Sequence, residues 1–194
     1  YSLRDLTEAE VHELAMVLKA NKSLKTFKLD WRNMREEHKL RFLASKHRTI
    51  VRNMENFKFE CEEGNVNVVR AFAQGGVCEK ADAMVCACEK GSLEVVQALV
   101  EGHAAEGTWV TLDEVLSKEG KDSSGELARP IDAAATALKF DIVVYLAGKG
   151  VKGEKFAGTP MVRACEKGDL DSVKAMVEGH DVEKTGMSAG EMVS

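Results

Sequence analysis

The sequence ACEKGSLEVVQALVEGH at residues 87–103 returns 77 residues later as ACEKGDLDSVKAMVEGH at residues 164–180. The offset holds without a gap beyond these segments, so that Ser117 corresponds to Ser194. Self-similarity over this range indicates a repeat architecture, in which each unit buries its apolar face by stacking on a neighbour. Such an architecture favours an extended binding surface over an enclosed catalytic cavity.

A shorter repeat lies inside the long one. Four segments begin with a turn, at Gly64, Gly91, Leu138 and Gly168, and apolar residues then recur with helical spacing. Helix-forming residues precede three of these turns, so each unit is predicted to be a helix, a tight turn and a second helix. Glycine suits the end of a helix because it adopts positive φ without a penalty. Leu138 departs from this rule and predicts a strained or differently shaped turn.

Two proline turns and one closing motif indicate the kind of unit. TPMV at residues 159–162 and RPID at residues 129–132 place Pro at the first turn of a helix, and GSLEVV stands at residues 91–96. These motifs resemble the opening Thr-Pro-Leu-His turn and the closing Gly-His-Leu-Glu-Val-Val of the ankyrin repeat. The motif His is missing, and the turns lie 27, 47 and 30 residues apart, whereas the family repeats every ~33 residues. The resemblance therefore identifies degenerate ankyrin repeats over about residues 55–194.

The resemblance implies a mainly α fold, an α-solenoid of stacked helix-turn-helix repeats. The units are expected at about residues 55–80, 81–128, 129–158 and 159–194, the last incomplete. Because an array that stops within a unit leaves an apolar face uncapped, we expect the natural chain to run further.

The long second unit carries an insertion. TLDE at residues 111–114 is a capping-box pattern, which predicts an extra short helix, and SAGE at residues 188–191 repeats the pattern. KDSSG at residues 121–125 predicts a hairpin turn.

Residues 1–54 follow a different pattern. A predicted helix around residues 7–18 leads to an alternating, strand-like segment at residues 21–29, and a second helix is expected from about residue 36 to residue 54. This helix-strand-helix order resembles a leucine-rich repeat of the ribonuclease-inhibitor type. One such repeat cannot bury its own core, so we expect it to pack on the ankyrin-like helices or on sequence upstream.

Cysteine and histidine residues follow the repeat and are interpreted as structural. Cys61, Cys88 and Cys165 occupy the same position of three units, as small core residues do. The odd number of cysteines, five, argues against a disulfide framework, and Cys86 and Cys88 with Cys78 nearby match structural zinc patterns poorly. No metal or cofactor is therefore expected, and a reducing compartment, cytoplasm or organelle interior, is favoured. His103 and His180 are equivalent by the 77-residue offset. No nucleophile elbow, phosphate loop or metalloprotease motif is present, and the chain is predicted not to be an enzyme.

Charge is divided unevenly along the chain. Residues 1–58 carry 13 basic and 8 acidic residues, and the remainder is acidic. One hypothesis is that the second helix meets phosphates or an acidic protein through a row of basic residues, Lys39, Arg41, Lys46, Arg48 and Arg52. Alternatives are a solvated helix face and attraction between the two halves of the chain. The acidic repeats make nucleic acid an unlikely main partner, and no apolar run approaches the ~20 residues of a membrane span.

We therefore predict a non-catalytic protein–protein interaction module, either a scaffold or an accessory subunit of a larger complex. Nucleic-acid association through the basic helix is the alternative. The ankyrin resemblance implies binding through the hairpin tips and the concave face of the first helices. Trp109 and Phe156 either anchor a partner or pack against the protein itself. The predicted contact residues are Glu79, Lys80, Asp82, Trp109, Asp122, Ser123, Arg129, Lys152, Glu154, Lys155 and Phe156.

Overall fold

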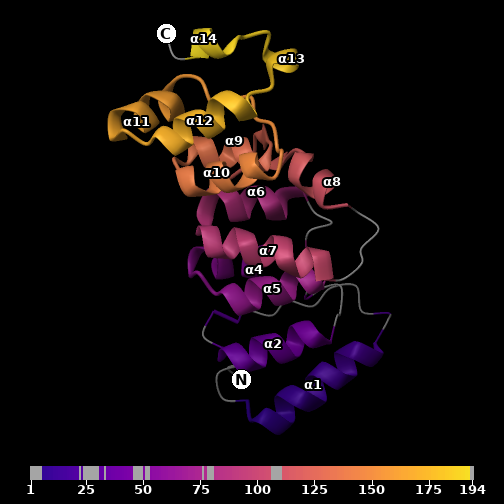
Figure 1. Cartoon of the computed structure of the whole chain (residues 1–194). Coiled ribbons are helices and arrows are strands. Elements are labelled where there is room, and N and C mark those ends of the chain that lie inside the picture. The colour runs from indigo at the N-terminus through magenta and orange to yellow at the C-terminus, as the bar shows by residue number, and fades with distance from the viewer. Residues whose placement is uncertain are drawn as a thin grey trace.

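The protein is mainly helical (Figure 1). The computed structural model describes residues 6–21, 23, 31–32, 34–45, 50, 53–75, 77, 81–105 and 111–192. Its helices are α1 (Glu8–Ala20), α2 (Glu36–Ala44), α4 (Met54–Glu62), α5 (Val66–Gln74), α6 (Ala81–Lys90), α7 (Leu93–Ala105), α8 (Leu112–Ser117), α9 (Pro130–Thr136), α10 (Phe140–Gly148), α11 (Thr159–Lys167), α12 (Leu170–Gly179), α13 (Val182–Thr185) and α14 (Ala189–Met192). The strands β1 (Gly120–Lys121) and β2 (Leu127–Ala128) form an antiparallel hairpin.

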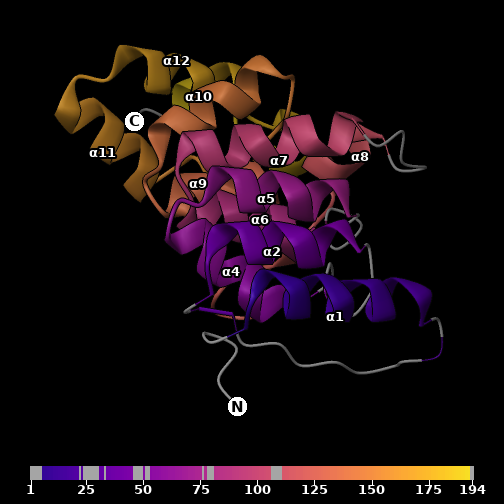
Figure 2. The ribbon, with the colours of Figure 1, turned by 90° about the horizontal axis from the view of Figure 1, so that it is seen from below.

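Apart from the inserted helix α8, the helices from α4 to α12 form successive pairs that lie in two rows. One row contains α5, α7, α10 and α12, and the other contains α4, α6, α9 and α11. Within each row a helix packs on its neighbours, most extensively α5 on α7 and α6 on α9. Both views show α1, α2, α5 and α7 in succession, with α12 toward the other end (Figures 1 and 2). The helix-turn-helix units predicted around the four turns are therefore present.

The turns within the pairs differ in conformation. Gly64 has φ 73° and Gly168 has φ 67°, as predicted for glycine at a helix end. Leu138 has φ 57° and is the one non-glycine residue with positive φ among the described residues, which agrees with the predicted strain. The prediction was wrong for Gly91, which lies outside the left-handed region. Gly91 is required by close packing instead, because a Cβ there would lie 2.7 Å from the Ala87 carbonyl oxygen.

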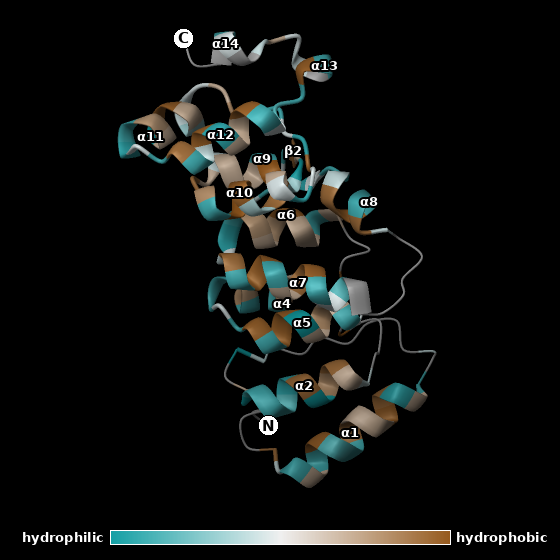
Figure 3. Cartoon of the chain, in the orientation of Figure 1, coloured by the Kyte–Doolittle hydropathy of each residue, from teal (hydrophilic) through white to brown (hydrophobic). Residues whose placement is uncertain are grey.

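One continuous apolar core runs through the pairs. Brown apolar positions alternate with teal polar ones along helices such as α5 and α7, as expected of amphipathic helices (Figure 3). Fully buried side chains from successive pairs include Phe72, Leu99, Ile142 and Met176. Each pair thus contributes its apolar stripe to a core shared with its neighbours.

The predicted insertion forms α8. The Thr111 hydroxyl accepts a hydrogen bond from the Glu114 N–H at 3.2 Å, and the Glu114 carboxylate accepts one from the Thr111 N–H at 2.8 Å. This confirms the capping box. In the second copy, the Ser188 N–H donates to the Glu191 carboxylate at 2.8 Å, just before α14. Val115 and Leu116 of α8 are buried in the common core.

Helix α2 packs on α5 of the first pair, and α1 packs on α2, so the N-terminal segment contacts the helix pairs as one of the two expectations stated. The rings of Trp31 and Phe72 meet edge to face with centroids 5.3 Å apart, and Phe57 adds a second such contact to Phe72 at 5.5 Å. The side chains of Lys39 on α2 and Glu60 on α4 form a buried ion pair with 2.7 Å between Nζ and Oε1. Attraction between the two differently charged parts of the chain is therefore present at this contact.

The predicted helix over residues 36–54 was wrong in extent. Helix α2 ends at Ala44, and Asn53 is extended and accepts hydrogen bonds from the N–H groups of Glu55 and Asn56, which starts α4. The strand predicted at residues 21–29 lies outside the described residues except for Asn21 and Ser23.

Candidate interaction surface

The hairpin between β1 and β2 is held against α6 by hydrogen bonds. The Asp122 carboxylate accepts hydrogen bonds from Ser124 and from the Glu126 N–H, which closes the turn, and these bonds lower the pKa of Asp122. Ser123 donates to the Glu89 carboxylate through its N–H, at 3.0 Å, and through its hydroxyl. The predicted contact residues Asp122 and Ser123 thus sit on a preorganised, exposed tip.

The Arg129 guanidinium joins three segments of the chain. It lies 2.9 Å from Glu154 Oε1 and 3.0 Å from Asp181 Oδ2, and it also donates to the Lys152 carbonyl oxygen at 3.2 Å. Its side chain is 16% exposed. The structure therefore brings together three of the predicted contact residues, Arg129, Lys152 and Glu154. Arg129 itself mainly links the loop at Lys152 and Glu154 to Asp181.

Asp132 positions the loop that carries Lys155. Its carboxylate is buried and accepts hydrogen bonds from the N–H groups of Glu154 and Lys155, both at 2.7 Å. Burial raises the pKa of Asp132 although these two bonds act in the opposite direction. The side chain of Lys155 is exposed.

Phe156 does not contact a partner through its side chain, which corrects one of the predictions. The residue is 0% exposed, its ring centroid lies 6.4 Å from that of His180, and a Cβ at Gly153 would overlap it. Asp82 accepts a hydrogen bond from the Lys121 N–H at 2.8 Å and is half-buried. Glu79, Lys80 and Trp109 lie outside the described residues.

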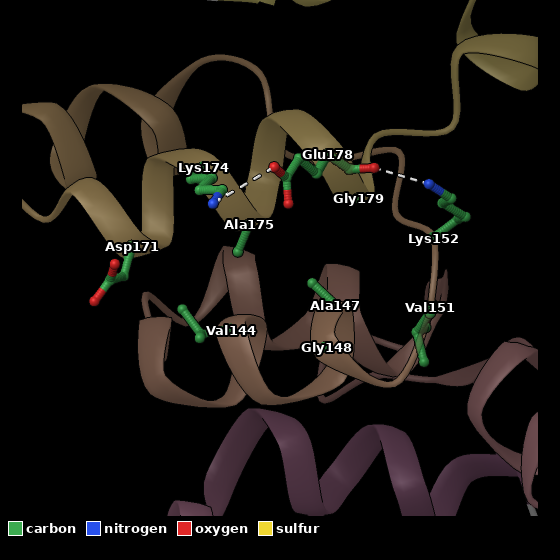
Figure 4. Close-up of a pocket in the computed structure, with 11 residues that line it drawn as sticks. Val144, Ala147, Gly148, Val151, Lys152, Asp171, Lys174, Ala175, Glu178 and Gly179 are labelled. Atoms are coloured by element: carbon green, nitrogen blue, oxygen red, sulfur yellow. Dashed lines mark hydrogen bonds and ion pairs between the residues drawn. The ribbon is translucent and has the colours of Figure 1, made fainter.

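Two shallow grooves flank the segment Gly150–Lys152, and sequence reasoning did not predict either of them. The first, of 270 Å³, runs between α10 and α12. Figure 4 shows Val144 and Ala147 of α10 facing Ala175 of α12 across it. The second groove, of 260 Å³, lies beside α8 and is lined by Asp113, Leu116, Ser117, Arg129, Lys149, Gly150, Val151 and Lys152.

The first groove exists because α10 and α12 pack less closely than their counterparts. A Cβ at Gly102 of α7 would lie 2.7 Å from the Ala73 Cβ of α5, so those two helices touch tightly. By the 77-residue offset Gly179 corresponds to Gly102, yet a Cβ there would lie 3.5 Å from the Ala147 Cβ. Gly102 and Ala73 thus pack tightly between α5 and α7, whereas Gly179 and Ala147 line an open groove between α10 and α12.

The rim of the first groove carries both charges. Lys152 Nζ donates to the Glu178 carbonyl oxygen at the end of α12, at 2.8 Å. Lys174 Nζ lies 3.9 Å from Glu178 Oε1, and both side chains are largely exposed. An apolar floor with a rim of mixed charge suits the side chains and backbone of a protein segment.

The two described residues of the predicted basic row, Lys39 and Arg41, both contact other parts of the chain. Lys39 is buried in its pair with Glu60, and Arg41 donates to the Glu8 carbonyl oxygen at 3.3 Å. Lys46, Arg48 and Arg52 lie outside the described residues.

The predicted equivalence of the core cysteines also needs correction. Cys61 and Cys88 are buried, and burial raises the pKa of both thiols, whereas Cys165 is exposed. His103 and His180 are both buried, as structural residues are.

Within the part of the chain that the structure describes, no helix is long and apolar enough to cross a membrane. In the same residues, His, Cys, Asp and Glu side chains form no group of three or more able to hold a metal ion. No protein-family model, curated protein or solved structure matches this chain.

Proposed function

We propose that this chain is a non-catalytic protein–protein interaction module, built as an α-solenoid of degenerate ankyrin-like repeats behind a leucine-rich-repeat-like segment. The stacking of helix pairs in two rows supports the repeat assignment. The motifs TPMV at residues 159–162 and RPID at residues 129–132 each begin the first helix of a pair, α11 or α9.

The proposed contact surface consists of the hairpin tip at Asp122–Ser123, the loop at Lys152–Lys155 and the two grooves beside Gly150–Lys152. The observation that carries the proposal is the position of Arg129, which lines the second groove and links the loop at Lys152 and Glu154 to Asp181. Rigid loops bind with a smaller loss of conformational entropy than mobile ones. The surface therefore offers a preorganised site to one folded partner or to an extended segment.

We further propose that the protein works as a subunit of a larger assembly. Large apolar side chains are exposed toward both ends of the stack, among them Met16 and Val17 on α1 and Leu170 on α12. Exposed apolar residues of this size mark interaction surfaces when they gather on one face.

Photo-crosslinking tests the contact surface. A photoreactive residue placed at Lys155 or Lys174 should crosslink to the same protein in a native extract, whereas one placed at Lys139, at the opposite end of α10 from the loop, should not. With the captured protein purified, Lys155→Glu should weaken binding at least tenfold and the matched control Lys139→Glu less than twofold. The proposal is wrong if positions 155 and 174 share no partner, or if both charge reversals weaken binding equally.

A further inference from the structure

Two thiols meet between the first helices of the first two pairs. Cys61 near the end of α4 and Cys86 in α6 both belong to the common core, and α4 packs on α6. Their side chains form a hydrogen bond with each other across this contact. Both residues are free cysteines, so the contact joins two thiols and not the halves of a disulfide.

The repeat does not account for the position of Cys86. Cys61 and Cys88 occupy the same position of their units, whereas the residue equivalent to Cys86 by the 77-residue offset is Arg163. Because arginine stands there in the second copy, the repeat does not require a small apolar residue at this position. The thiol beside Cys61 is therefore a feature of the contact between α4 and α6.

The two thiols differ in how readily they lose a proton. Burial raises the pKa of Cys61, and the hydrogen bond to Cys86 raises it further. The same hydrogen bond lowers the pKa of Cys86, and so does the charge of Lys58. Burial and the nearby carboxylates of Glu89 and Glu62 act on Cys86 in the opposite direction. Because the thiolate is the reactive form of cysteine, Cys86 is the nucleophile of the pair and Cys61 is the thiol beside it.

Access to this pair of thiols is narrow. Cys86 is 3% exposed, Cys61 is 1% exposed, and Cys88, which follows on α6, is 0% exposed. A bulky oxidant such as glutathione disulfide does not fit against a side chain enclosed to this degree, whereas hydrogen peroxide is little larger than a water molecule. The site therefore favours a small peroxide as the oxidant.

We propose that Cys61 and Cys86 form an oxidative modification site, at which hydrogen peroxide converts the two thiols into a reversible disulfide between α4 and α6. The Cys86 thiolate attacks one peroxide oxygen, the O–O bond breaks, and the departing hydroxide takes up a proton and leaves as water. The Cys61 sulfur then attacks the sulfur of the Cys86 sulfenic acid. The S–S bond forms, the S–O bond breaks, and a second water leaves with the Cys61 proton. The two sulfur atoms together give two electrons to the peroxide, and a dithiol reductant reverses the reaction by exchange.

The disulfide fixes the junction between the first two helix pairs. Glu60, next to Cys61 on α4, holds α2 through its ion pair with Lys39. Glu89 on α6 accepts the hydrogen bonds that hold the hairpin tip. Oxidation thus links the helix that anchors the N-terminal segment to the helix that carries the hairpin. The site is additional to the proposed contact surface and does not depend on it.

Peptide mapping of the intact chain tests the site. Trypsin separates the thiols, because Cys61 falls in residues 59–70, Cys78 in residues 71–80, and Cys86 and Cys88 in residues 81–90. After treatment with hydrogen peroxide and alkylation of the remaining thiols, residues 59–70 should be found linked to residues 81–90. Dithiothreitol should remove this link.

Cys88 provides the matched control on the same helix. The link should persist in Cys88→Ala and be absent from Cys86→Ala, with circular dichroism confirming that both variants are folded. Fragmentation of the linked peptide from the parent chain identifies the same sulfur atoms without any variant. A link through Cys78 or Cys88, or no link at a peroxide concentration that oxidises the exposed Cys165, would overturn the proposal.

The rate of oxidation tests the role of Cys86 separately. Lys58 and Glu62 are exposed and act on the pKa of Cys86 in opposite directions. Lys58→Gln should form the link about threefold more slowly than the parent chain, and Glu62→Gln should form it faster, since a larger thiolate fraction reacts faster. Equal rates in these two variants would refute the assignment of Cys86 as the nucleophile.

Discussion

The buried ion pair between α2 and α4 provides the sharpest test of how the N-terminal helices are held. Lys39 is 5% exposed and Glu60 is 0% exposed, with 2.7 Å between Nζ and Oε1. Glu60 Oε2 also accepts a hydrogen bond from Asn65 Nδ2 at 2.6 Å, and Lys39 Nζ lies 5.4 Å from the centroid of the Phe59 ring. Neither charge has access to bulk water to compensate for loss of its partner.

Removing one partner should cost far more than removing both. Lys39→Met leaves a buried carboxylate and Glu60→Gln leaves a buried ammonium, and each should lower the free energy of unfolding by about 3 kcal/mol. This is the low end of the usual range because Asn65 and Phe59 still contact the remaining charge. The double variant buries no charge and keeps an amide acceptor for Asn65, so it should lie within about 1 kcal/mol of the original protein.

Urea unfolding monitored by circular dichroism and tryptophan fluorescence measures these changes, since Trp31 reports on the N-terminal contact. Arg70→Gln serves as the control, because it breaks an ion pair with Glu101 in which both side chains are exposed. Its expected cost is at most about 1 kcal/mol. The reasoning is refuted if either single variant behaves like the control, or if the double variant is less stable than both single variants.

Three further predictions concern positions where the local environment decides the outcome. Gly168→Ala should cost about 1–2 kcal/mol because of its positive φ, and Gly168→Asn should recover part of this loss. At Gly91 both substitutions should cost about 1–3 kcal/mol in urea unfolding, because the added Cβ meets the backbone of α6, and recovery by Asn there would contradict this explanation. Asp132→Asn should preserve stability at neutral pH, whereas Asp132→Ala should cost about 1–3 kcal/mol by leaving two N–H groups without an acceptor. Because the pKa of Asp132 is raised in the folded state, the stabilisation that comes from protonating Asp132 is present at pH below the unfolded value of 3.8 and is lost as pH rises through the folded value. Asn does not titrate, so thermal unfolding across this range should show less of this loss in Asp132→Asn. Mass spectrometry after brief iodoacetamide treatment should find Cys165 modified well before Cys88, and equal rates would contradict the difference in burial between these two thiols.

Local sequence patterns predicted the units of the fold. Helical spacing of apolar residues, a proline at the start of α9 and α11 and the Thr111–Glu114 capping box depend on residues within one or two turns of each other. The strained turn at Leu138 was predictable for the same reason, since it needs only the backbone geometry of one helix end. The hairpin tip and the loop around Lys152 were also found by their place in the repeat.

Only the tertiary structure decided which of these residues face solvent. Val85 and Val162 occupy the same position of the long repeat and have opposite exposure, because burial depends on the element that packs opposite, and that element is encoded elsewhere in the chain. The same holds for Phe156, which Gly153 and His180 enclose, and for Lys39, whose partner Glu60 lies 21 residues away. The sequence by itself determined the helices, turns and caps, whereas the packing of one unit on the next determined the grooves, the buried charges and the different exposure of equivalent residues such as Val85 and Val162.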